Sequence, residues 1–221
     1  MSHSVKIKSI MQVTHDVKCF RTSKPTGFHF ASGQATDLAI NQPGYEEQVR
    51  PFTFTCLDGD NYLEFTIKRY EERHGITDRL HQLKPGDELL ISDAWGAIEY
   101  KGPGYFIAGG AGITPFISIL RKLSKEKQLA GNTLFFSNKT TADIIYETEI
   151  SAMLHEQAVY LLTRENRPGY KSGHIDKQFI QQHIRDFNRH FYVCGPDKMV
   201  QDMVAVLGEA GAATDALVFE K

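Results

Sequence analysis

The pattern of apolar residues changes once along the chain, at Gly102-Pro103-Gly104, and this change limits what the chain can fold into. Before it, short runs suited to half-buried strands are separated by turn residues such as Pro43-Gly44 and Pro85-Gly86-Asp87. After it, short apolar runs alternate with helical patterns. Because each pattern builds a different kind of core, the chain is predicted to form two domains, residues 1–101 and 102–221.

The first domain is predicted to be a small antiparallel β-barrel. Val5–Val13 alternates apolar and polar residues, which is the period of a strand with one buried face. One helix-like segment, Thr77–Leu83, interrupts the strands. The other predicted strands are Val17–Arg21, Ala35–Ile40, Arg50–Cys56, Tyr62–Lys68 and Glu88–Ser92. Many short strands with a single helical insert are typical of such barrels.

The second domain is predicted to be an α/β domain with a doubly wound parallel sheet, because strands alternate with helices. The predicted strands are Tyr105–Ala108, Thr133–Phe136, Val159–Leu162, Phe191–Val193 and Leu217–Phe219. The predicted helices are Pro115–Lys127, Ile144–Leu154, Asp176–Ile184 and Asp197–Ala210.

Composition excludes several classes of protein. A net charge of -2 argues against a general field for nucleic acid. The three cysteines lie far apart without a Cys-x-x-Cys pair, which favours a reducing compartment and argues against an iron–sulfur cluster. The nine histidines lack zinc-ligand spacing, so no metal site is expected. No apolar run resembles a signal peptide or a membrane span, and a cytoplasmic location without membrane association is therefore expected.

The segment of residues 106–120, FIAGGAGITPFISIL, is the strongest candidate for a nucleotide site. A buried strand runs into Gly109, Gly110 and Gly112 and then directly into a helix. Glycines allow the backbone to approach a ligand closely, and a helix start with Thr114 as N-cap and Pro115 as first helical residue favours a phosphate. The spacing differs from the standard Gly-x-Gly-x-x-Gly, so a turn needed only for packing is the alternative.

A second candidate lies at Cys194-Gly195-Pro196, followed by Met199. Gly195 and Pro196 end a strand and open a helix, so Cys194 is placed at the carboxyl end of that strand. In open α/β sheets this edge is where ligands bind. The alternative is a small buried residue beside a turn.

Five segments together resemble the ferredoxin–NADP reductase superfamily over nearly the whole chain. The resemblance is carried by GGAGITP at 109–115, CGPDKM at 194–199, the segment Phe28–Gln34 that ends in Gly-Gln, Arg50-Pro51-Phe52-Thr53, and Gly75-Ile76-Thr77. The first two resemble the nicotinamide-nucleotide motifs of that family, and the others resemble its flavin-binding barrel.

The resemblance implies that the barrel binds FAD. Arg50 would donate to a flavin phosphate, Phe52 would lie against the isoalloxazine where the family has Tyr, and Thr53 would place a hydroxyl near flavin N5. Contacts to the pyrophosphate and to the adenosine half are implied for Gly75, Ile76, Thr77, Arg69 and Tyr70, with Thr77 also suited to cap the helix. Lone Arg, Thr and Phe residues with purely structural roles are the alternative.

The resemblance also implies the nucleotide contacts and the reaction centre. NAD(P)H would bind across Gly110–Pro115 and Cys194–Met199. Together with Thr53 and Cys194, Glu220 would lie beside the contact of nicotinamide and flavin, although the chain ends in Lys221 where many relatives have an aromatic residue. Lys139 and Arg164 follow neighbouring strands that lack a terminal Asp or Glu, which favours NADP over NAD.

The function implied is an enzyme that moves electrons between NAD(P)H and a flavodoxin or ferredoxin through bound FAD. A cluster of basic residues beside the implied flavin site would steer an acidic carrier: Lys68, Arg69, Arg73, Arg79 and Lys84. Two alternatives stay open. One is a reductase of free flavin or quinone, or the reductase subunit of an oxygenase, and the other is a non-catalytic flavin- or nucleotide-binding module.

Overall fold

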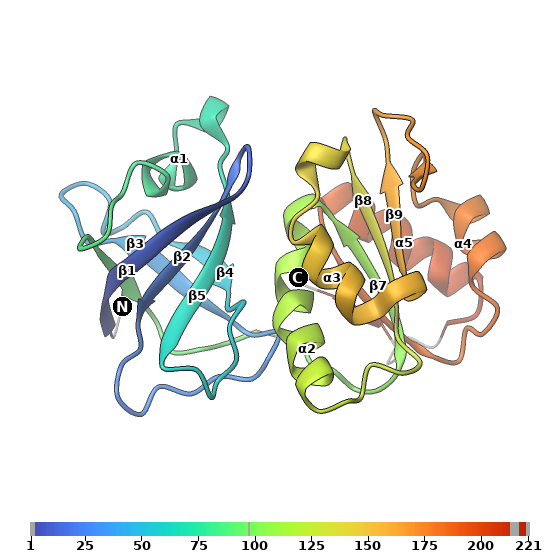
Figure 1. Cartoon of the computed structure of the whole chain (residues 1–221), viewed down its shortest axis with the longest axis horizontal. Helices are drawn as coiled ribbons and strands as arrows, with labels where there is room; N and C mark the ends of the chain where they lie inside the picture. Colours follow the sequence, from blue (N-terminus) through green and yellow to red (C-terminus); the bar gives the residue numbers. More distant parts are fainter. Residues whose placement is uncertain (1–2, 97, 213–216, 220–221) are drawn as a thin grey trace.

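The chain forms an antiparallel barrel followed by a parallel α/β domain in a computed structural model (Figure 1). The structure describes residues 3–96 and 98–212, except the side chain of Arg73, and the backbone of residues 217–219. The predicted fold class is confirmed. The boundary between residues 101 and 102 stays a prediction.

The first sheet has six antiparallel strands in the order β4-β3-β6-β1-β2-β5. The strands are β1 (His3–Thr14), β2 (Val17–Ser23), β3 (Ala35–Ile40), β4 (Arg50–Thr53), β5 (Tyr62–Lys68) and β6 (Glu88–Ile91). The two outermost strands meet through an isolated bridge between Phe54 and Phe65, which closes the barrel. Between β5 and β6 lie the 3-10 helix η1 (Glu71–Arg73) and the helix α1 (Ile76–Leu80). Apolar side chains from all six strands fill the barrel interior.

The second sheet has six parallel strands in the order β10-β9-β8-β7-β11-β12. They are β7 (Gly104–Gly109), β8 (Thr133–Asn138), β9 (Ala158–Leu162), β10 (Lys171–Ser172), β11 (His190–Cys194) and β12 (Leu217–Phe219). The α-helices are α2 (Thr114–Lys125), α3 (Glu147–Leu154), α4 (Lys177–His183) and α5 (Asp197–Glu209). Short 3-10 helices are η2 (Gly110–Ile113), η3 (Thr141–Asp143) and η4 (His155–Gln157).

Helices cover both faces of the parallel sheet, as a doubly wound fold requires. On one face α2 and α3 bury Phe116, Leu120 and Ile150 against the strands. On the other face α4 and α5 bury Phe179 and Leu207. Figure 1 shows that α2 lies on the side of the α/β domain that faces the barrel.

The barrel packs directly on α2. Val17 and Ile98 from the first part of the chain belong to the same apolar cluster as the α2 side chains. The backbone N–H of Gly33 donates to Ser118 Oγ on α2 (3.0 Å), and a side chain at Gly33 would collide with the carbonyl of Ile98. Because these contacts are buried and specific, the two domains meet in one defined arrangement.

The helix predicted over Ile144–Leu154 begins only at Glu147. Thr140 and Asp143 form a capping box around the preceding 3-10 turn, in which Asp143 accepts the N–H of Thr140 (2.9 Å). Tyr146 then adopts a left-handed conformation with φ 53°. Local side-chain hydrogen bonds therefore replace the first helical turn that the apolar pattern predicted.

Among the described helices, none has both the length and the apolar character of a transmembrane segment.

Candidate functional site

The order of the parallel strands reverses between β7 and β11. From β7 the chain continues to β8 and β9 on one side of the sheet, and it later returns to add β11 and β12 on the other side. The two central strands end at Gly109 and Cys194, and Cys194 pairs with Ala108, the residue before Gly109. Such a switch point opens a crevice that binds ligands in α/β proteins. The two nucleotide motifs thus lie at the edge where a ligand is expected.

The glycine turn after β7 is in direct contact with the segment after β11. A Cβ atom added to Gly112 would lie 2.5 Å from the carbonyl carbon of Cys194 and 2.6 Å from Cα of Gly195. At Gly109 it would lie 2.5 Å from Met199 Sδ. The two segments therefore form one backbone surface that only glycines permit.

Gly110 has a different environment within the same turn. Its φ is +52°, and an added Cβ would have no heavy atom of the described chain within 4 Å. The turn is thus packed on one side and open on the other, and the open side can accommodate a ligand close to the backbone.

The start of α2 differs from the prediction. A 3-10 turn, Gly110–Ile113, leads straight into the helix, so Ile113 is the N-cap, Thr114 is the first helical residue and Pro115 the second. The hydroxyl of Thr114 donates to the carbonyl of Ala111 (3.1 Å) instead of capping a free N–H. The predicted capping role of Thr114 is therefore wrong. The backbone N–H of Thr114 also donates to the carbonyl of Ala111, and Pro115 has no N–H, so the helical backbone that could face an anion begins at the turn of Gly110 and not at Thr114.

The predicted flavin residues lie on β4, which is an outer strand of the barrel sheet. Arg50 is exposed, and its Nη1 donates to the neighbouring carbonyl of Val49 (2.7 Å). Phe52 is half-buried against the barrel core, and Thr53 is half-buried and pairs with Ala35. The guanidinium of Arg50 is therefore accessible to a charged ligand.

The segment after β5 is held by hydrogen bonds within the protein. Arg69 Nε donates to Asp78 (2.7 Å), and the N–H of Tyr70 donates to the hydroxyl of Thr77 (3.3 Å). Gly75 is the N-cap of α1, so the prediction that Thr77 caps this helix is wrong. Ile76 is buried in the barrel core, which leaves only its backbone for a contact with a ligand.

Lys139 and Arg164, predicted from separate strand ends, are brought together. The backbone N–H of Arg164 donates to the carbonyl of Lys139 (2.9 Å), and both residues are exposed. Next to them, Glu165 accepts the N–H of Thr141 (2.7 Å). Two exposed cations thus lie beside the carboxyl ends of β8 and β9, while the carboxylate of Glu165, in the loop after β9, accepts from Thr141 in the loop after β8.

The residue that the sequence reasoning missed is Asn138, at the carboxyl end of β8. It is 5% exposed, and both polar atoms of its amide have no hydrogen-bond partner among the described residues. A buried unpaired amide is destabilising by about 1–3 kcal/mol, so a partner from outside the chain is expected. The signal was available in the sequence, because Asn138 continues the inward-facing series Leu134, Phe136.

Cys194 is the last residue of β11 and is 5% exposed. Glu220 lies outside the described residues.

Family comparison matches both domains. An oxidoreductase FAD-binding domain matches residues 4–100, and an oxidoreductase NAD-binding domain matches residues 106–205. Together the two matches span nearly the whole chain.

Individual relatives are more distant. The reductase component of propane 2-monooxygenase from Rhodococcus jostii is 26% identical over 233 residues, covering 98% of this chain, and this chain spans 62% of the length of that relative. NADH-cytochrome b5 reductase 2 from Debaryomyces hansenii is 29% identical over 232 residues, covering 96% of this chain and 75% of the relative.

Solved structures share the fold. The ferredoxin NADP+ reductase from Neisseria gonorrhoeae with bound FAD and NADP has a TM-score of 0.85 at 20% identity, with 99% of this chain and 97% of that chain covered. The FAD/NAD-binding domain of nitric oxide dioxygenase from Vibrio cholerae has a TM-score of 0.87 at 18% identity, with 98% and 97% covered.

A barrel joined to a parallel sheet with a glycine turn at its switch point defines a class, the FAD- and NAD(P)-binding oxidoreductases. Within that class, the chain belongs to the ferredoxin–NADP reductase superfamily. The predicted family, enzyme class and pair of cofactors are thereby confirmed.

Proposed function

We propose that this chain moves electrons between NAD(P)H and a one-electron carrier of the flavodoxin or ferredoxin type through FAD bound between its two domains. The observation that carries the proposal is the contact of Gly112 with Cys194 and Gly195 at the switch point. It joins both nucleotide motifs into one surface on the domain that packs against the flavin-binding barrel. When bound, FAD supplies the conversion between hydride transfer and single-electron transfer.

The barrel side offers donors that fit FAD. The exposed guanidinium of Arg50 provides a planar fork for a phosphate, and the backbone at Gly75, Ile76 and Thr77, at the start of α1, would contact the pyrophosphate. Phe52 keeps an aromatic face on β4 but has no hydroxyl to donate. The side chains of Arg69 and Tyr70 complete the proposed binding region for the adenosine half.

The α/β side offers a surface that fits a dinucleotide. The open backbone at Gly110, in the turn that leads into α2 at Thr114 and Pro115, would hold the pyrophosphate. Gly195, Pro196 and Met199 border this region from the other strand. Asn138 would gain hydrogen-bond partners from the bound nucleotide, which would account for its buried amide having no partner among the described residues.

We assign the positions beside the reacting atoms to Thr53, Cys194 and Glu220. A Thr hydroxyl and a thiol can donate hydrogen bonds, and a carboxylate can accept one, so together they would orient the two rings. Hydride transfer depends on close approach and alignment, which such short side chains allow.

NADP is the preferred nucleotide in this proposal. Lys139 and Arg164 are adjacent and exposed, and Glu165 is held by Thr141, so the region presents positive charge to a 2′-phosphate. Measuring kcat/KM for NADPH and NADH tests this preference, and a higher value for NADH would reverse it.

The basic cluster proposed to bind an acidic carrier has less unpaired positive charge than the sequence suggests. Lys68 pairs with Asp16 (2.5 Å) and Arg69 with Asp78 (2.7 Å), whereas Lys84 is exposed. Arg79 donates to Gln42 (2.7 Å). The side chain of Arg73 lies outside the described part of the chain. Stronger support for a protein acceptor comes from the relatives, whose names include cytochrome b5 reductase and ferredoxin–NADP reductase.

The second candidate function is the reductase component of an oxygenase, which the similarity to the propane 2-monooxygenase reductase favours. Both candidates use the same first half-reaction, and they differ in the acceptor. Reduction of free flavin or quinone is a further outcome that the same assay distinguishes.

The experiment starts with purified protein reconstituted with FAD. The expected result is a yellow protein whose flavin absorbance is bleached by NADPH without oxygen and restored by flavodoxin or ferredoxin. Ferricyanide serves as an artificial acceptor. If the protein reduces ferricyanide but neither flavodoxin nor ferredoxin, its acceptor is of another kind, such as an oxygenase component, free flavin or a quinone. A colourless protein that takes up no FAD would contradict the proposal, and a yellow protein that NAD(P)H does not bleach would indicate a non-catalytic module.

A further inference from the structure

Arg121 lies on α2 and reaches from the α/β domain into the barrel. Its Nη1 donates to the backbone carbonyl of Thr55 (2.7 Å) and to Glu64 Oε1 (2.7 Å). Its Nε and Nη2 donate to the two carboxylate oxygens of Glu149 on α3 (2.6 and 2.9 Å). Through four hydrogen bonds, one guanidinium thus joins two helices of one domain to two segments of the other.

The acceptor in the barrel is a buried charge. Glu64 on β5 is 1% exposed, and it also accepts from Arg21 Nε (2.8 Å) and from the hydroxyl of Thr55 (2.9 Å). Two arginines and two glutamates therefore balance each other at the boundary of the domains. A buried carboxylate tolerates such a position only while its partners stay in place.

The ionisation of this group follows from the same contacts. Burial alone would raise the pKa of Glu64, but Arg121, Arg21 and the hydroxyl of Thr55 together outweigh it and the pKa is lowered. Burial alone would lower the pKa of Arg121, but hydrogen bonds and charges from Glu149 and Glu64 raise it. Both groups therefore stay charged across the physiological range, and their attachment does not switch with pH.

Tyr146 adds a strained element to the same boundary. Its left-handed φ of 53° is unfavourable for a bulky residue. Its hydroxyl lies 3.1 Å from the hydroxyl of Thr66 in the barrel, and its ring lies 5.2 Å from the Arg121 guanidinium. Such strain persists only where surrounding contacts hold it, so these contacts define one arrangement of the domains.

The two ends of this connection are close to the two halves of the proposed reaction site. Thr55 is two residues beyond Thr53, which we assign to the flavin. Arg121 is seven residues beyond Thr114, about 10 Å further along the same helix. Because α2 is one continuous helix, a shift of the helix at Arg121 also shifts the nucleotide turn at the start of the helix.

We propose that Arg121 is a positioning residue for hydride transfer: by holding Thr55 and Glu64, it fixes the distance and angle between the flavin-binding strand and the nucleotide-binding helix. The inference rests on the proposed function and adds to it a residue that neither cofactor needs to touch. A displacement of about 1 Å between reacting groups lowers a rate roughly 100-fold, so a contact that fixes the domains has a large effect on the chemical step.

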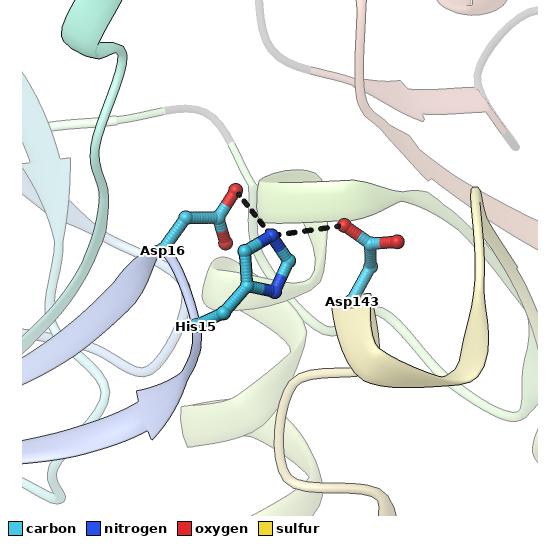
Figure 2. A group of neighbouring side chains, drawn as sticks. All are labelled: His15, Asp16 and Asp143. Carbon is cyan, nitrogen blue, oxygen red and sulfur yellow. Dashed lines mark ion pairs between the residues drawn. The ribbon is translucent and has the colours of Figure 1, made fainter.

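A second contact between the same domains provides a matched control. At the tip of the β1–β2 hairpin, His15 Nε2 lies 3.6 Å from Asp16 and 3.8 Å from Asp143 in the α/β domain (Figure 2). The side chain of His15 is 58% exposed, and Asp16 also pairs with Lys68. Because His15 itself is largely exposed, its contacts with Asp143 and with the carbonyl of Ala142 (3.3 Å) are expected to contribute little, so the control removes interdomain contacts with little effect on how the domains are held.

The test compares Arg121→Ala, Arg121→Lys and Glu149→Gln with His15→Ala in FAD-loaded protein. Stopped-flow measurement under anaerobic conditions gives the rate constant of flavin reduction at saturating NADPH and the apparent Kd. For Arg121→Ala we expect the rate constant to fall roughly 10- to 100-fold while the Kd changes less than about threefold. Arg121→Lys should give a smaller loss because it keeps the positive charge beside Glu64, although it loses the planar fork. Glu149→Gln should also give a smaller loss because the contacts of Arg121 with Thr55 and Glu64 remain, and His15→Ala should match wild type.

A second readout does not depend on activity. Spin labels at Lys8→Cys on β1 and Gln181→Cys on α4, both exposed positions, report the distance between the domains, while the native cysteines are buried. We expect a narrow distance distribution in wild type and His15→Ala and a broader one in Arg121→Ala. If Arg121→Ala fails to fold, Arg121→Lys and Glu149→Gln decide the question by the same criteria.

The outcomes separate the two proposals. A wild-type protein that NADPH does not reduce would refute the proposed function, while the distance distributions would still decide whether Arg121 holds the domains. A wild-type rate of flavin reduction in the Arg121 variants would overturn the positioning role, whatever their distances. So would a loss of rate that is explained fully by loss of FAD.

Discussion

The proposed nucleotide site on the α/β domain and the proposed flavin site on the barrel are built by different means. On the nucleotide side, the turn at Gly109–Gly112 is pressed against Cys194 and Gly195, so the site is a backbone surface that exists before any ligand binds. On the flavin side, the principal charged group is the exposed side chain of Arg50 on an outer strand. In a site made of backbone, the atoms that bind the ligand also pack the fold. In a site made of an exposed side chain, the binding group can be changed without affecting the fold.

This difference has a practical consequence for substitution. A change in the nucleotide turn should alter stability and binding together, because the same atoms serve both. A change at Arg50 should alter binding alone. The predictions below test that separation and are ordered from the largest expected effect to the smallest.

Gly112→Ala should give the largest effect. The new Cβ would lie 2.5 Å from the carbonyl carbon of Cys194, a backbone atom that cannot rotate away. We expect kcat/KM for NADPH to fall at least about 100-fold and the free energy of unfolding to fall by about 1–3 kcal/mol, as in overpacked cores. Thermal unfolding and steady-state kinetics measure both quantities.

The control for this substitution is Gly208→Ala. Gly208 lies within α5, and an added Cβ would meet no atom of the described chain within 4 Å. Alanine should stabilise this helix by about 0.5–1 kcal/mol and leave the kinetics unchanged. Equal losses in both variants would show that the nucleotide turn is not specially packed.

Arg50→Ala should weaken FAD binding without affecting the fold. Loss of a charged hydrogen bond contributes about 1.5–3 kcal/mol, so the Kd for FAD should rise roughly 10- to 100-fold. The stability of the FAD-free protein should stay within about 0.5 kcal/mol of wild type, because the side chain is exposed. Titration calorimetry and chemical denaturation provide the measurements.

Arg50→Lys keeps the charge but loses the planar fork, so it should give an intermediate Kd. A marked loss of stability in the FAD-free Arg50→Ala protein would remove the distinction between the two sides of the cleft.

Arg164→Ala should lower the preference for NADPH over NADH by about tenfold, the effect of one charged hydrogen bond to a phosphate. Binding of NADH should change little, because the 2′-phosphate is absent there. Ratios of kcat/KM for the two nucleotides provide the measurement, with Arg185→Ala as an exposed control. An unchanged ratio would place the 2′-phosphate elsewhere.

The smallest expected effect is a pH dependence of stability caused by a histidine in the barrel core. His81 is 9% exposed, its Nε2 contacts the carbonyl of Ile67 (2.8 Å), and burial lowers its pKa below the ordinary histidine value of 6.5. The unfolded chain therefore binds a proton more readily, so the contribution of neutral His81 is fully present above pH 6.5 and is lost as pH falls below it.

Denaturation of the FAD-free protein at pH 7.5 and pH 5 measures this loss, which His81→Asn should reduce. The exposed His174 provides the control, since His174→Gln should leave the pH dependence as in wild type. If the loss of stability between pH 7.5 and pH 5 is unchanged in His81→Asn, other titratable groups cause it. The buried histidine would then contribute nothing to the pH dependence of the barrel.

The sequence predicted most of the architecture because local patterns carry it. Ala35–Ile40 and Tyr62–Lys68 have the predicted bounds, since alternation and flanking turn residues determine where such strands begin and end. Tyr146 shows the limit, because capping contacts ended a predicted helical pattern early. The roles of the predicted site residues stay predictions, although the structure brings the two nucleotide motifs together.

What the sequence determined by itself is the order of strands and helices and the glycine turn, because both depend on neighbouring residues. What only the tertiary structure decided is the connection between the domains and the burial of the Asn138 amide, which has no hydrogen-bond partner in the part of the chain that the structure describes. Arg121 and its partners Glu64 and Thr55 are separated by 57 and 66 residues, and no local pattern reports that they meet. The physical reason is that periodicity records which face of an element is buried, whereas a buried charge pair depends on what another element places opposite it.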